Sequence, residues 1–434
     1  MKEDFTTTNN GGEDVKDVPS IVDKRKLFPG DRVLGIIIVM FFAISTVVVY
    51  SASSILGFRD GSTNIYLQKH LGTLAICAGL IVLCYIISAR LMRHFTLLAY
   101  IVSWLMTLAP YFVGGATNSA HRWLDLGFVK FQPSELLKIG TVMLLAAQLS
   151  KLNERIKRVH MLPSTFDVRQ WGTTRERKIF REEIIPIVAP IALSCGVILP
   201  AHFSSAFHLF IISLGILFIA GVHWKELFKF TAVAGIVGAV ALTAMTLAGV
   251  GRGATIISRF KKHFNVENTQ KESAKSIFDK YDDTDRSRMA IYNGGIFGVG
   301  AGRSLMRARL THPESDYLFA IMVEEFGLLL SFIIILLYLW LFFRALRIFE
   351  KCEWLYAGLL AVGLALLITS QGFLHIAVAT GIIPETGQNL PFLTQGRTGM
   401  FCASIAVGII LSISRQVETG RLVPPSMQSK NGEI

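Results

Sequence analysis

The chain has 434 residues, of which 52% are hydrophobic and 17% charged, and its mean hydropathy is +0.50. It is too apolar for a soluble domain and too long for a single membrane span, so we expect a polytopic membrane protein. The net charge of +12 would suit a nucleic-acid-binding protein if the chain were soluble, but in a membrane protein it is typical of loops that face anionic lipid. We therefore expect no nucleic-acid partner.

Uninterrupted apolar runs of about 20 residues predict membrane-spanning helices. At 1.5 Å per residue such a run crosses a hydrocarbon core of roughly 30 Å, whereas the strands of a β-barrel would alternate apolar and polar side chains. The runs lie at about residues 33–52, 70–89, 96–114, 134–150, 184–200, 204–222, 229–250, 316–343, 355–383 and 398–414. The expected fold is thus all-α, with ten transmembrane helices and an insertion signal in the first span itself rather than in a cleavable signal peptide.

The segments outside these runs predict the domain organisation and the orientation. Residues 1–32 are polar and lack periodicity, which indicates a disordered tail; the membrane domain is expected to cover residues 33–415, and residues 416–434 form a second tail. The loops after spans two, four and eight are basic, so both termini are predicted to be cytoplasmic. The loop 251–315 then lies outside, between helices seven and eight. It carries twelve basic and seven acidic residues, which its length permits because long segments translocate regardless of charge.

The start of the fourth span combines helix-start signals with ionisable side chains. Pro133 suits the first turn of a helix, and Glu135 complements the positive end of the helix dipole. Glu135 and Lys138 are three residues apart and can pair on one helix face. The spacing favours such structural pairing, with a role in substrate binding as the alternative. Arg122, beside Trp123, has an interfacial anchor as its simpler interpretation.

A glycine-rich segment follows, with five glycines between Gly294 and Gly302. Glycines permit tight turns and a close approach of backbone N–H groups to an anion, but without a preceding strand this is not a dinucleotide fingerprint. The flanking cations favour a phosphate-bearing ligand, and a re-entrant loop is the alternative; these cations are Arg286, Arg288, Arg303, Arg307 and Arg309.

The stretch His312–Gly327 places an acid at the mouth of a long apolar helix. Asp316 directly precedes the apolar run, which predicts either a helix N-cap or a general base or metal ligand that the helix dipole keeps ionised. The two roles are compatible. Glu324 and Glu325 lie about 12 Å deeper by helical rise, and acids within a membrane are functional candidates unless a neighbouring helix pairs with them. We expect Glu324 to face the side of Asp316.

Residues 384–399 hold two prolines and three glycines between the last two spans. They predict a re-entrant segment whose non-helical backbone is buried in protein or lines a wet cavity. Gln371 and His375, four residues apart on the preceding span, present one polar face. Their spacing favours hydrogen bonding in the core, with ligand contact as the alternative.

Together these stretches resemble the SEDS family (shape, elongation, division and sporulation), which includes FtsW, RodA and SpoVE. The resemblance runs from the first span to Arg415, and the FtsW branch is the most similar. It rests on four motifs in the family's order: Arg122–Gly127 with Phe131–Lys138, Ser287–Gly302, Ser315–Ala320 with the two glutamates, and Leu390–Leu393.

The resemblance implies a peptidoglycan glycosyltransferase that polymerises lipid II on the outer face of the bacterial cytoplasmic membrane during cell division. It also implies a class B penicillin-binding protein as partner, together with other membrane proteins of the division or elongation machinery. It implies that Asp316 is the essential acid and a possible metal ligand, and that a divalent metal, Mg²⁺ or Mn²⁺, assists an inverting transfer from which undecaprenyl pyrophosphate leaves. The predicted substrate-binding residues, within and outside the matching segments, are Arg122, Gln132, Glu135, Lys138, Arg259, Ser287, Gly294, Gly295, Gln371 and Thr394.

Three positions depart from the family pattern. His202 stands where many members have an acid, so a carboxylate role at that position is lost. Arg397 replaces a second glycine, and the Pro-Glu pair before Asp316 is shifted by two places, which leaves Glu314 without an assigned role. Because Asp316 and the Gln-Pro-Ser-Glu segment are intact, these changes indicate a divergent lineage rather than a lost activity.

Three other functions remain as alternatives. A lipid II flippase should line its path with polar groups and show internal repeats, and most ionisable residues here are predicted at the outer face. An elongation polymerase of the RodA kind would share the chemistry, since only the charged N-terminal tail favours the division role. A non-catalytic scaffold that recruits division partners could coexist with catalysis.

Overall fold

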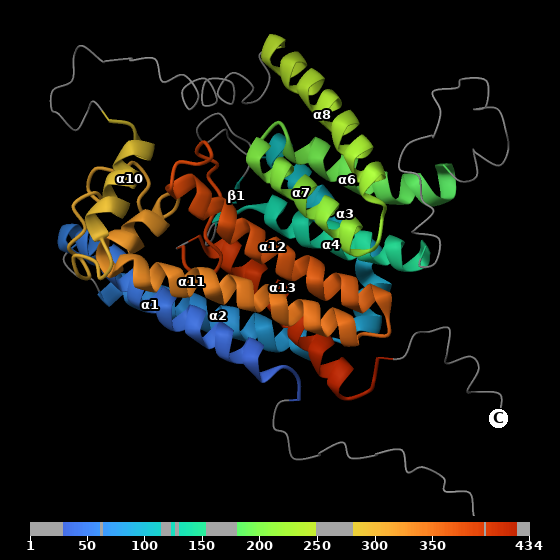
Figure 1. Cartoon of the computed structure of the whole chain (residues 1–434), viewed down its shortest axis with the longest axis horizontal. Helices are drawn as coiled ribbons and strands as arrows, with labels where there is room; N and C mark the ends of the chain where they lie inside the picture. Colours follow the sequence, from blue (N-terminus) through green and yellow to red (C-terminus); the bar gives the residue numbers. More distant parts are fainter. Residues whose placement is uncertain are drawn as a thin grey trace, which may run out of the picture.

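A computed structural model describes residues 29–60, 64–113, 123–125, 130–152, 180–248, 281–394 and 396–422. This part of the chain is a bundle of helices (Figure 1). The helices are α1 (Arg32–Asp60), α2 (Asn64–Ile86), α3 (Ala89–Val113), α4 (Pro133–Leu152), α6 (Ile185–Ile198), α7 (Phe203–Ile219), α8 (Trp224–Leu247), α10 (Asp283–Gly294), α11 (Leu318–Lys351), α12 (Leu355–Ala379) and α13 (Arg397–Glu418). A π-helical turn, Phe180–Ile184, precedes α6.

Every predicted span overlaps one of these helices, but the expectation of ten membrane crossings is not confirmed. Among the described residues, seven helices are long and apolar enough to cross a membrane: α1, α2, α3, α8, α11, α12 and α13. Helices α6 and α7 have 14 and 17 residues, which gives them about 21 and 26 Å by helical rise against a core of roughly 30 Å. For α4, α6 and α7 a full crossing stays a prediction.

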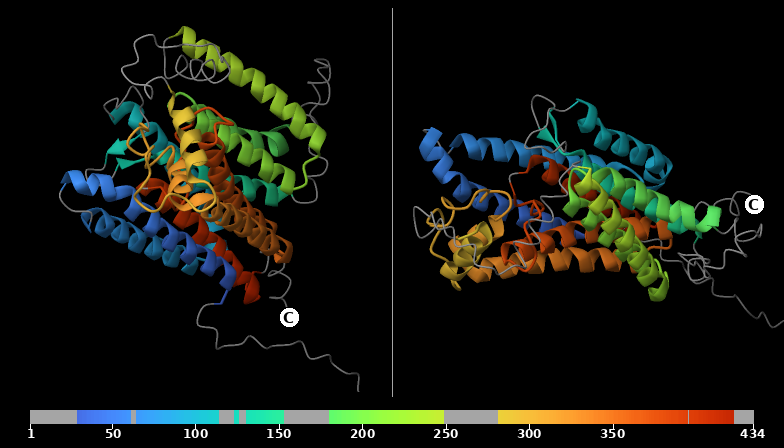
Figure 2. Two further views of the ribbon diagram at one scale, coloured as in Figure 1. Left: turned by 60° about the vertical axis from the view of Figure 1, so that its left-hand side comes forward. Right: turned by 90° about the horizontal axis from the view of Figure 1, so that it is seen from above.

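Helix α4 is not among these seven helices, and its neighbours, rather than lipid, surround it. It packs against α3, α6, α7 and α12, and most of its residues are buried. A helix enclosed by protein can carry the ionisable Glu135 and Lys138. Helix α12 is likewise enclosed, whereas α8 packs mainly on α7 and lies at the edge of the bundle in Figures 1 and 2.

The fold is not purely helical. A two-stranded antiparallel ribbon, β1 (Leu124–Asp125) and β2 (Lys130–Phe131), pairs Leu124 with Phe131 just before α4. The Thr398 hydroxyl in the first turn of α13 donates to the Lys130 carbonyl at 3.1 Å. The ribbon therefore connects the start of α4 to the start of α13.

Helix α11 is broken at Gly327, where the sequence predicted one continuous apolar helix. Gly327 has φ +80° and ψ 176°, far from helical values. The glycine-rich segment packs into this break: the N–H groups of Leu328 and Leu329 donate to the Gly295 and Ile296 carbonyls at 3.0 and 3.3 Å. A Cβ atom on Gly327 would lie 2.1 Å from the Ile296 carbonyl oxygen, so only glycine fits.

The predicted re-entrant segment is confirmed as non-helical backbone that is largely buried in protein. Residues 384–394 lie between α12 and α13 without regular structure, and most of their side chains are buried. Phe392 adopts φ +66° and stacks on Phe41 of α1 with ring centroids 5.4 Å apart. Side chains from the surrounding helices satisfy carbonyl groups of this segment; the Tyr338 hydroxyl of α11, for example, donates to the Pro391 carbonyl at 2.5 Å.

Candidate functional site

Asp316 lies in the turn that leads into α11. It is half-buried, and its backbone N–H donates to the His312 carbonyl at 3.1 Å. Helix α11 begins at Leu318 and its N-cap residue is Tyr317, so the prediction that Asp316 is the N-cap is wrong. Because the sequence from Tyr317 onward is uniformly apolar apart from the glutamates, hydropathy alone could not fix the first helical residue. Asp316 still lies within one turn of the positive end of the helix dipole.

Acids from other parts of the chain lie near Tyr317, the residue that follows Asp316. Burial raises the pKa of the neighbouring Tyr317, and the carboxylates of Glu385, Asp283 and Asp282 raise it further, while a hydrogen bond with Thr284 lowers it. The Tyr317 hydroxyl therefore stays neutral at physiological pH. The carboxylates come from the start of α10 and from the re-entrant segment, so three parts of the chain that are distant in sequence converge on the turn that holds Asp316.

The segment between α10 and α11 holds the two glutamates of α11. Glu324 accepts hydrogen bonds from Asn293 Nδ2 at 2.9 Å, from the backbone N–H groups of Leu305 and Met306 at 3.2 and 3.3 Å, and from the Ser304 hydroxyl. This network explains how a fully buried carboxylate is retained. These partners come from α10 and from the segment between α10 and α11. The simpler expectation from the sequence, a partner on a neighbouring membrane helix, does not hold for Glu324.

Glu325 forms a buried ion pair with Arg307. It also accepts a hydrogen bond from the Ser51 hydroxyl of α1, and Arg307 Nη1 donates to the Ser51 carbonyl at 2.6 Å. Burial lowers the pKa of Arg307, whereas Glu325 and Glu324 raise it. The pair connects α1, α11 and the segment between α10 and α11. No local pattern in the sequence marks Arg307 or Ser51 as taking part in it.

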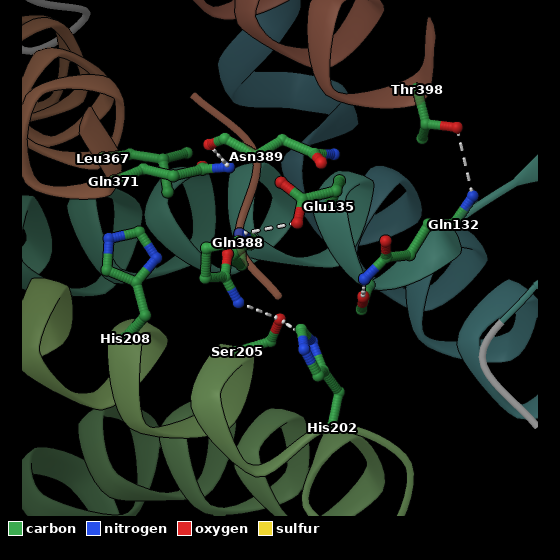
Figure 3. Close-up of polar contacts among 12 residues, drawn as sticks. Gln132, Glu135, His202, Ser205, His208, Leu367, Gln371, Gln388, Asn389 and Thr398 are labelled. Carbon is green, nitrogen blue, oxygen red and sulfur yellow. Dashed lines mark hydrogen bonds and ion pairs between the residues drawn. The ribbon is translucent and has the colours of Figure 1, made fainter. Parts of the chain in front are cut away.

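A second polar cluster surrounds the re-entrant segment inside the bundle (Figure 3). Gln371 Nε2 donates to the Asn389 carbonyl at 3.2 Å, and Gln388 Nε2 donates to the Ser205 hydroxyl at 2.7 Å. His202, at the N-cap of α7, bonds the Ser205 hydroxyl through Nδ1 and the Thr386 carbonyl through Nε2 at 3.0 Å. His202 is thus a structural link between α7 and the re-entrant segment.

The start of α4 forms another side of this cluster. Gln132 donates through its backbone N–H to the Thr398 hydroxyl at 3.3 Å and through Nε2 to Ser134 at 3.1 Å. The predicted Glu135–Lys138 pair is confirmed, with Lys138 Nζ 2.8 Å from Glu135 Oε1, and the Lys138 side chain is fully buried. The Glu135–Lys138 contact is an ion pair that lacks hydrogen-bond geometry. The buried polar atoms without a hydrogen-bond partner in the described part of the chain include Lys138 Nζ, His208 Nδ1 and Gln388 Oε1.

The buried cluster reaches the turn of Asp316 through His375. Its Nδ1 donates to the Gln388 carbonyl at 2.9 Å, since a carbonyl can only accept, and its Nε2 accepts the Phe319 backbone N–H at 3.5 Å. Phe319 is in the first turn of α11, where N–H groups lack helical partners. The predicted core hydrogen bonding of Gln371 and His375 is confirmed, and it aligns the start of α11 with the re-entrant segment.

The remaining predicted binding residues make separate hydrogen bonds or lie outside the described residues. Ser287 on α10 donates to the Ala379 carbonyl at 2.6 Å, and the Thr394 hydroxyl donates to the Leu390 carbonyl at 3.0 Å. Arg397 is exposed at the start of α13, and Glu314 is half-buried two residues before Asp316. Arg122 and Arg259 lie outside the described residues, so their predicted roles have no structural description.

The glycine-rich segment has a packing role that accounts for its composition. A Cβ atom on Gly294 would lie 2.1 Å from the Val323 carbonyl oxygen, while Gly295 has φ +52° at the end of α10. The N–H groups of Val299 and Gly300 donate to the Glu324 and Glu325 carbonyls at 2.9 and 3.0 Å. These N–H groups are therefore used by α11, and ligand binding by Gly294 and Gly295 stays a prediction.

A substitution at Gly294 separates packing from ligand binding. We expect Gly294→Ala to lower the thermal unfolding midpoint of the purified chain, because the added methyl group meets backbone atoms and overpacking of this kind costs about 2 kcal/mol or more. Gly79→Ala in α2 is the control, since its methyl group would meet nothing within 4 Å. A Gly294→Ala protein with an unchanged midpoint and reduced activity would instead assign Gly294 to substrate.

The arginines around the glycine-rich segment differ in how freely they can meet an anion. Arg286 Nη1 pairs with Asp283 at 3.0 Å, Arg288 donates to the Thr380 and Gly381 carbonyls at 3.2 and 2.9 Å, and Arg307 pairs with Glu325. Arg303 is exposed. Arg303 is thus better placed than the paired arginines to meet a phosphate.

The described residues do not form a protein-only metal site. No group of three or more His, Cys, Asp or Glu side chains in this part of the chain has the arrangement that a metal ion needs. Structural and catalytic sites built by protein alone use three or more ligands. The divalent metal expected from the sequence therefore stays a prediction, and no step of the proposed reaction depends on it.

Comparisons with known proteins match this architecture over most of its length. A family model described as "Cell cycle protein", for FtsW, RodA and SpoVE, matches residues 31–419. Proteins named probable peptidoglycan glycosyltransferase FtsW are similar: that of Neisseria gonorrhoeae is 27% identical, covering 92% of this chain and 86% of its own length, and that of Bacillus subtilis is 25% identical, covering 94% and 98%.

Two solved structures share the fold. One, described as "Structural coordination of polymerization and crosslinking by a peptidoglycan synthase complex", has a TM-score of 0.62 at 20% identity and covers 89% of this chain and 98% of the other. The crystal structure of the rod shape determining protein RodA of Thermus thermophilus has a TM-score of 0.56 at 20% identity, with 89% and 97% covered. At such identities the likeness concerns the fold alone.

Proposed function

Because this chain belongs to the FtsW/RodA/SpoVE family and is a multi-pass membrane glycosyltransferase of peptidoglycan synthesis, we propose that it polymerises lipid II into glycan strands with Asp316 as the general base. The observation that carries the proposal is the placement of Asp316. It is a half-buried carboxylate in a turn that is held on one side by the His312 carbonyl and on the other by the His375 contact to α11.

The proposed reaction is a single displacement. The Asp316 carboxylate accepts the proton of the 4-hydroxyl group on the acceptor sugar while that oxygen attacks the anomeric carbon of the donor. The bond from this carbon to the pyrophosphate oxygen breaks, and undecaprenyl pyrophosphate leaves. Since attack comes from the face opposite the leaving group, the α-linkage of the donor becomes a β-linkage in the glycan.

The leaving pyrophosphate requires positive charge nearby. We propose that cations of the segment 251–315 supply it: Arg303, which is exposed, and Arg259, which lies outside the described residues. Arg307 is a poor candidate because it is buried against Glu325. A divalent metal, if bound, would supply positive charge in the same sense, and Asp316 is the residue that would hold it.

The biological setting is also part of the proposal. We place the active site on the outer face of the bacterial cytoplasmic membrane and both termini inside. A contact between the two ends of the described chain supports placing them on one side, since the Gly30 N–H donates to the Glu418 carboxylate. The "Cell cycle protein" description of the family supports a role in division. The synthase complex with the same fold supports a crosslinking partner, a class B penicillin-binding protein.

A reconstituted assay tests this function against transport. The purified chain, with its penicillin-binding partner, is incubated with labelled lipid II in liposomes and a divalent metal, and both glycan length and lipid movement across the bilayer are measured. We expect glycan strands. Movement of lipid II without any polymer would show a flippase and overturn the proposal.

The Glu135–Lys138 pair provides a second test of the site. A Glu135→Leu/Lys138→Met double variant removes both buried charges together, which is often neutral for stability. If the pair contacts substrate or its bound water, the double variant should keep its unfolding midpoint and lose more than about tenfold in polymer formation, as expected when groups that contact substrate are removed. Wild-type activity would assign the pair to structure alone.

A further inference from the structure

A charged groove lies at the end of the bundle where the described chain ends meet. It has a volume of about 680 Å³ and is lined by the start of α1, the end of α11 and the end of α13. In Figure 1 the first residues of α1 and the last residues of α13 lie side by side at this end. All three helices are among those long and apolar enough to cross a membrane, so the groove opens where a bilayer would meet water.

The acids of the groove are already occupied. Asp31 accepts the backbone N–H groups of Val33 and Leu34, and it pairs with Arg344 at 2.6 Å. Glu418 accepts the Gly30 N–H. Asp31 is therefore neutralised by Arg344, and the one other carboxylate that lines the groove in the described part of the chain, Glu418, faces three further cations.

Three further cations line the same groove: Arg32 of α1 and Arg347 and Lys351 of α11. All three are exposed, and within the described part of the chain none of them forms an ion pair. The groove thus presents a local excess of positive charge to any anion of suitable size. A phosphate group with a small polar substituent fits both the volume and the charge.

Exposed apolar side chains continue from these cations along the same helix faces. On α1, Ile36 and Val39 follow Arg32 at helical spacing and are 55% and 67% exposed. On α11, Phe343 and Trp340 precede Arg347 by four and seven residues and are 57% and 47% exposed. Cations at the membrane surface with an apolar strip beneath them match the two parts of a phospholipid.

We infer that this groove binds the headgroup of an anionic phospholipid, with Arg32, Arg347 and Lys351 on the phosphate and the acyl chains along α1 and α11. The bound lipid would connect the start of α1 to the end of α11, beside the Asp31–Arg344 pair. This inference is independent of the glycosyltransferase site, since none of its residues belongs to the turn of Asp316, the glutamate network or the buried polar cluster.

Native mass spectrometry of the full chain in detergent tests the groove, with phosphatidylglycerol and phosphatidylcholine as probes. We expect the wild type to retain phosphatidylglycerol preferentially. The variant Arg347→Gln/Lys351→Gln should weaken this binding by about 25-fold, because each cation near the surface contributes about fivefold. The variant Arg90→Gln removes an exposed cation at the same end of the bundle but outside the groove, and should bind as the wild type does.

Three results would overturn the inference. Equal retention of the two lipids would show that the groove does not select an anion. An equal loss in Arg90→Gln and in the double variant would show a general charge effect. Displacement of phosphatidylglycerol by inorganic phosphate at equal concentration would assign the groove to a soluble anion. Polymer formation by the double variant, measured alongside, should remain at the wild-type rate.

Discussion

Replacing Asp316 by asparagine should reduce glycan formation from lipid II by about a hundredfold or more, because a general base typically contributes factors of 10² to 10⁴. Asparagine keeps the size and hydrogen-bonding oxygen of the side chain but cannot accept the hydroxyl proton. Since Asp316 is half-buried in a turn and its backbone N–H is what binds His312, we expect the turn and the start of α11 to keep their structure. The measurement is polymer formed per unit time by the reconstituted complex.

The matched control is Glu314→Gln, which removes one negative charge two residues earlier in the same half-buried turn. It should retain most of the activity if the effect at Asp316 is specific. The unfolding midpoint and the copurification with the penicillin-binding partner are measured for both variants. Wild-type polymer formation by Asp316→Asn would exclude Asp316 as the base, and an equal loss in both variants would point to the charge of the turn instead.

Local sequence patterns predicted the helices well because apolar length is a local property. All the apolar runs overlap helices, and the Glu135–Lys138 pair follows from a spacing of three residues on one face. The polar face of Gln371 and His375 was predictable for the same reason. Hydropathy could not show which helices are enclosed by protein. The sequence therefore did not predict that α4 is a buried helix of the core rather than a lipid-facing span.

The candidate site was harder to predict because its partners are distant in sequence. The glycine-rich segment suggested an anion site, yet the fold uses Gly294 and its neighbours to pack against the break of α11. Gln388 and Ser205, which join the re-entrant segment to α7, are 183 residues apart, and neither belongs to a motif. Arg307 was one of five cations whose clustering favoured a phosphate-bearing ligand, whereas in the structure it forms an ion pair with Glu325. Only the three-dimensional arrangement decides between an arginine that binds a ligand and one that neutralises a buried acid.

The Arg307–Glu325 pair should dominate the stability of the region where the α10–α11 segment packs on α1 and α11. Replacing Arg307 by methionine removes the cation that neutralises the buried Glu325, whose carboxylate keeps its hydrogen bond from the Ser51 hydroxyl. Removing one member of a buried ion pair lowers the free energy of unfolding by about 3–5 kcal/mol. We therefore expect Arg307→Met to lower the thermal unfolding midpoint of the full chain clearly. Arg303→Met, which removes an exposed arginine four residues earlier, should leave it nearly unchanged.

A double variant distinguishes the cost of the orphaned charge from the value of the pair itself. In Arg307→Met/Glu325→Leu both charges are replaced by apolar side chains of similar length, and the unfolding midpoint should recover most of the loss. The pair also connects α1 to the α10–α11 segment through Ser51, so a stable double variant should be tested for polymer formation as well. Recovery of stability without activity would mean that the charges hold the loop in register for Asp316. Recovery of both would mean that packing alone suffices. A double variant no more stable than Arg307→Met would contradict the view that the buried, unpaired Glu325 causes the destabilisation.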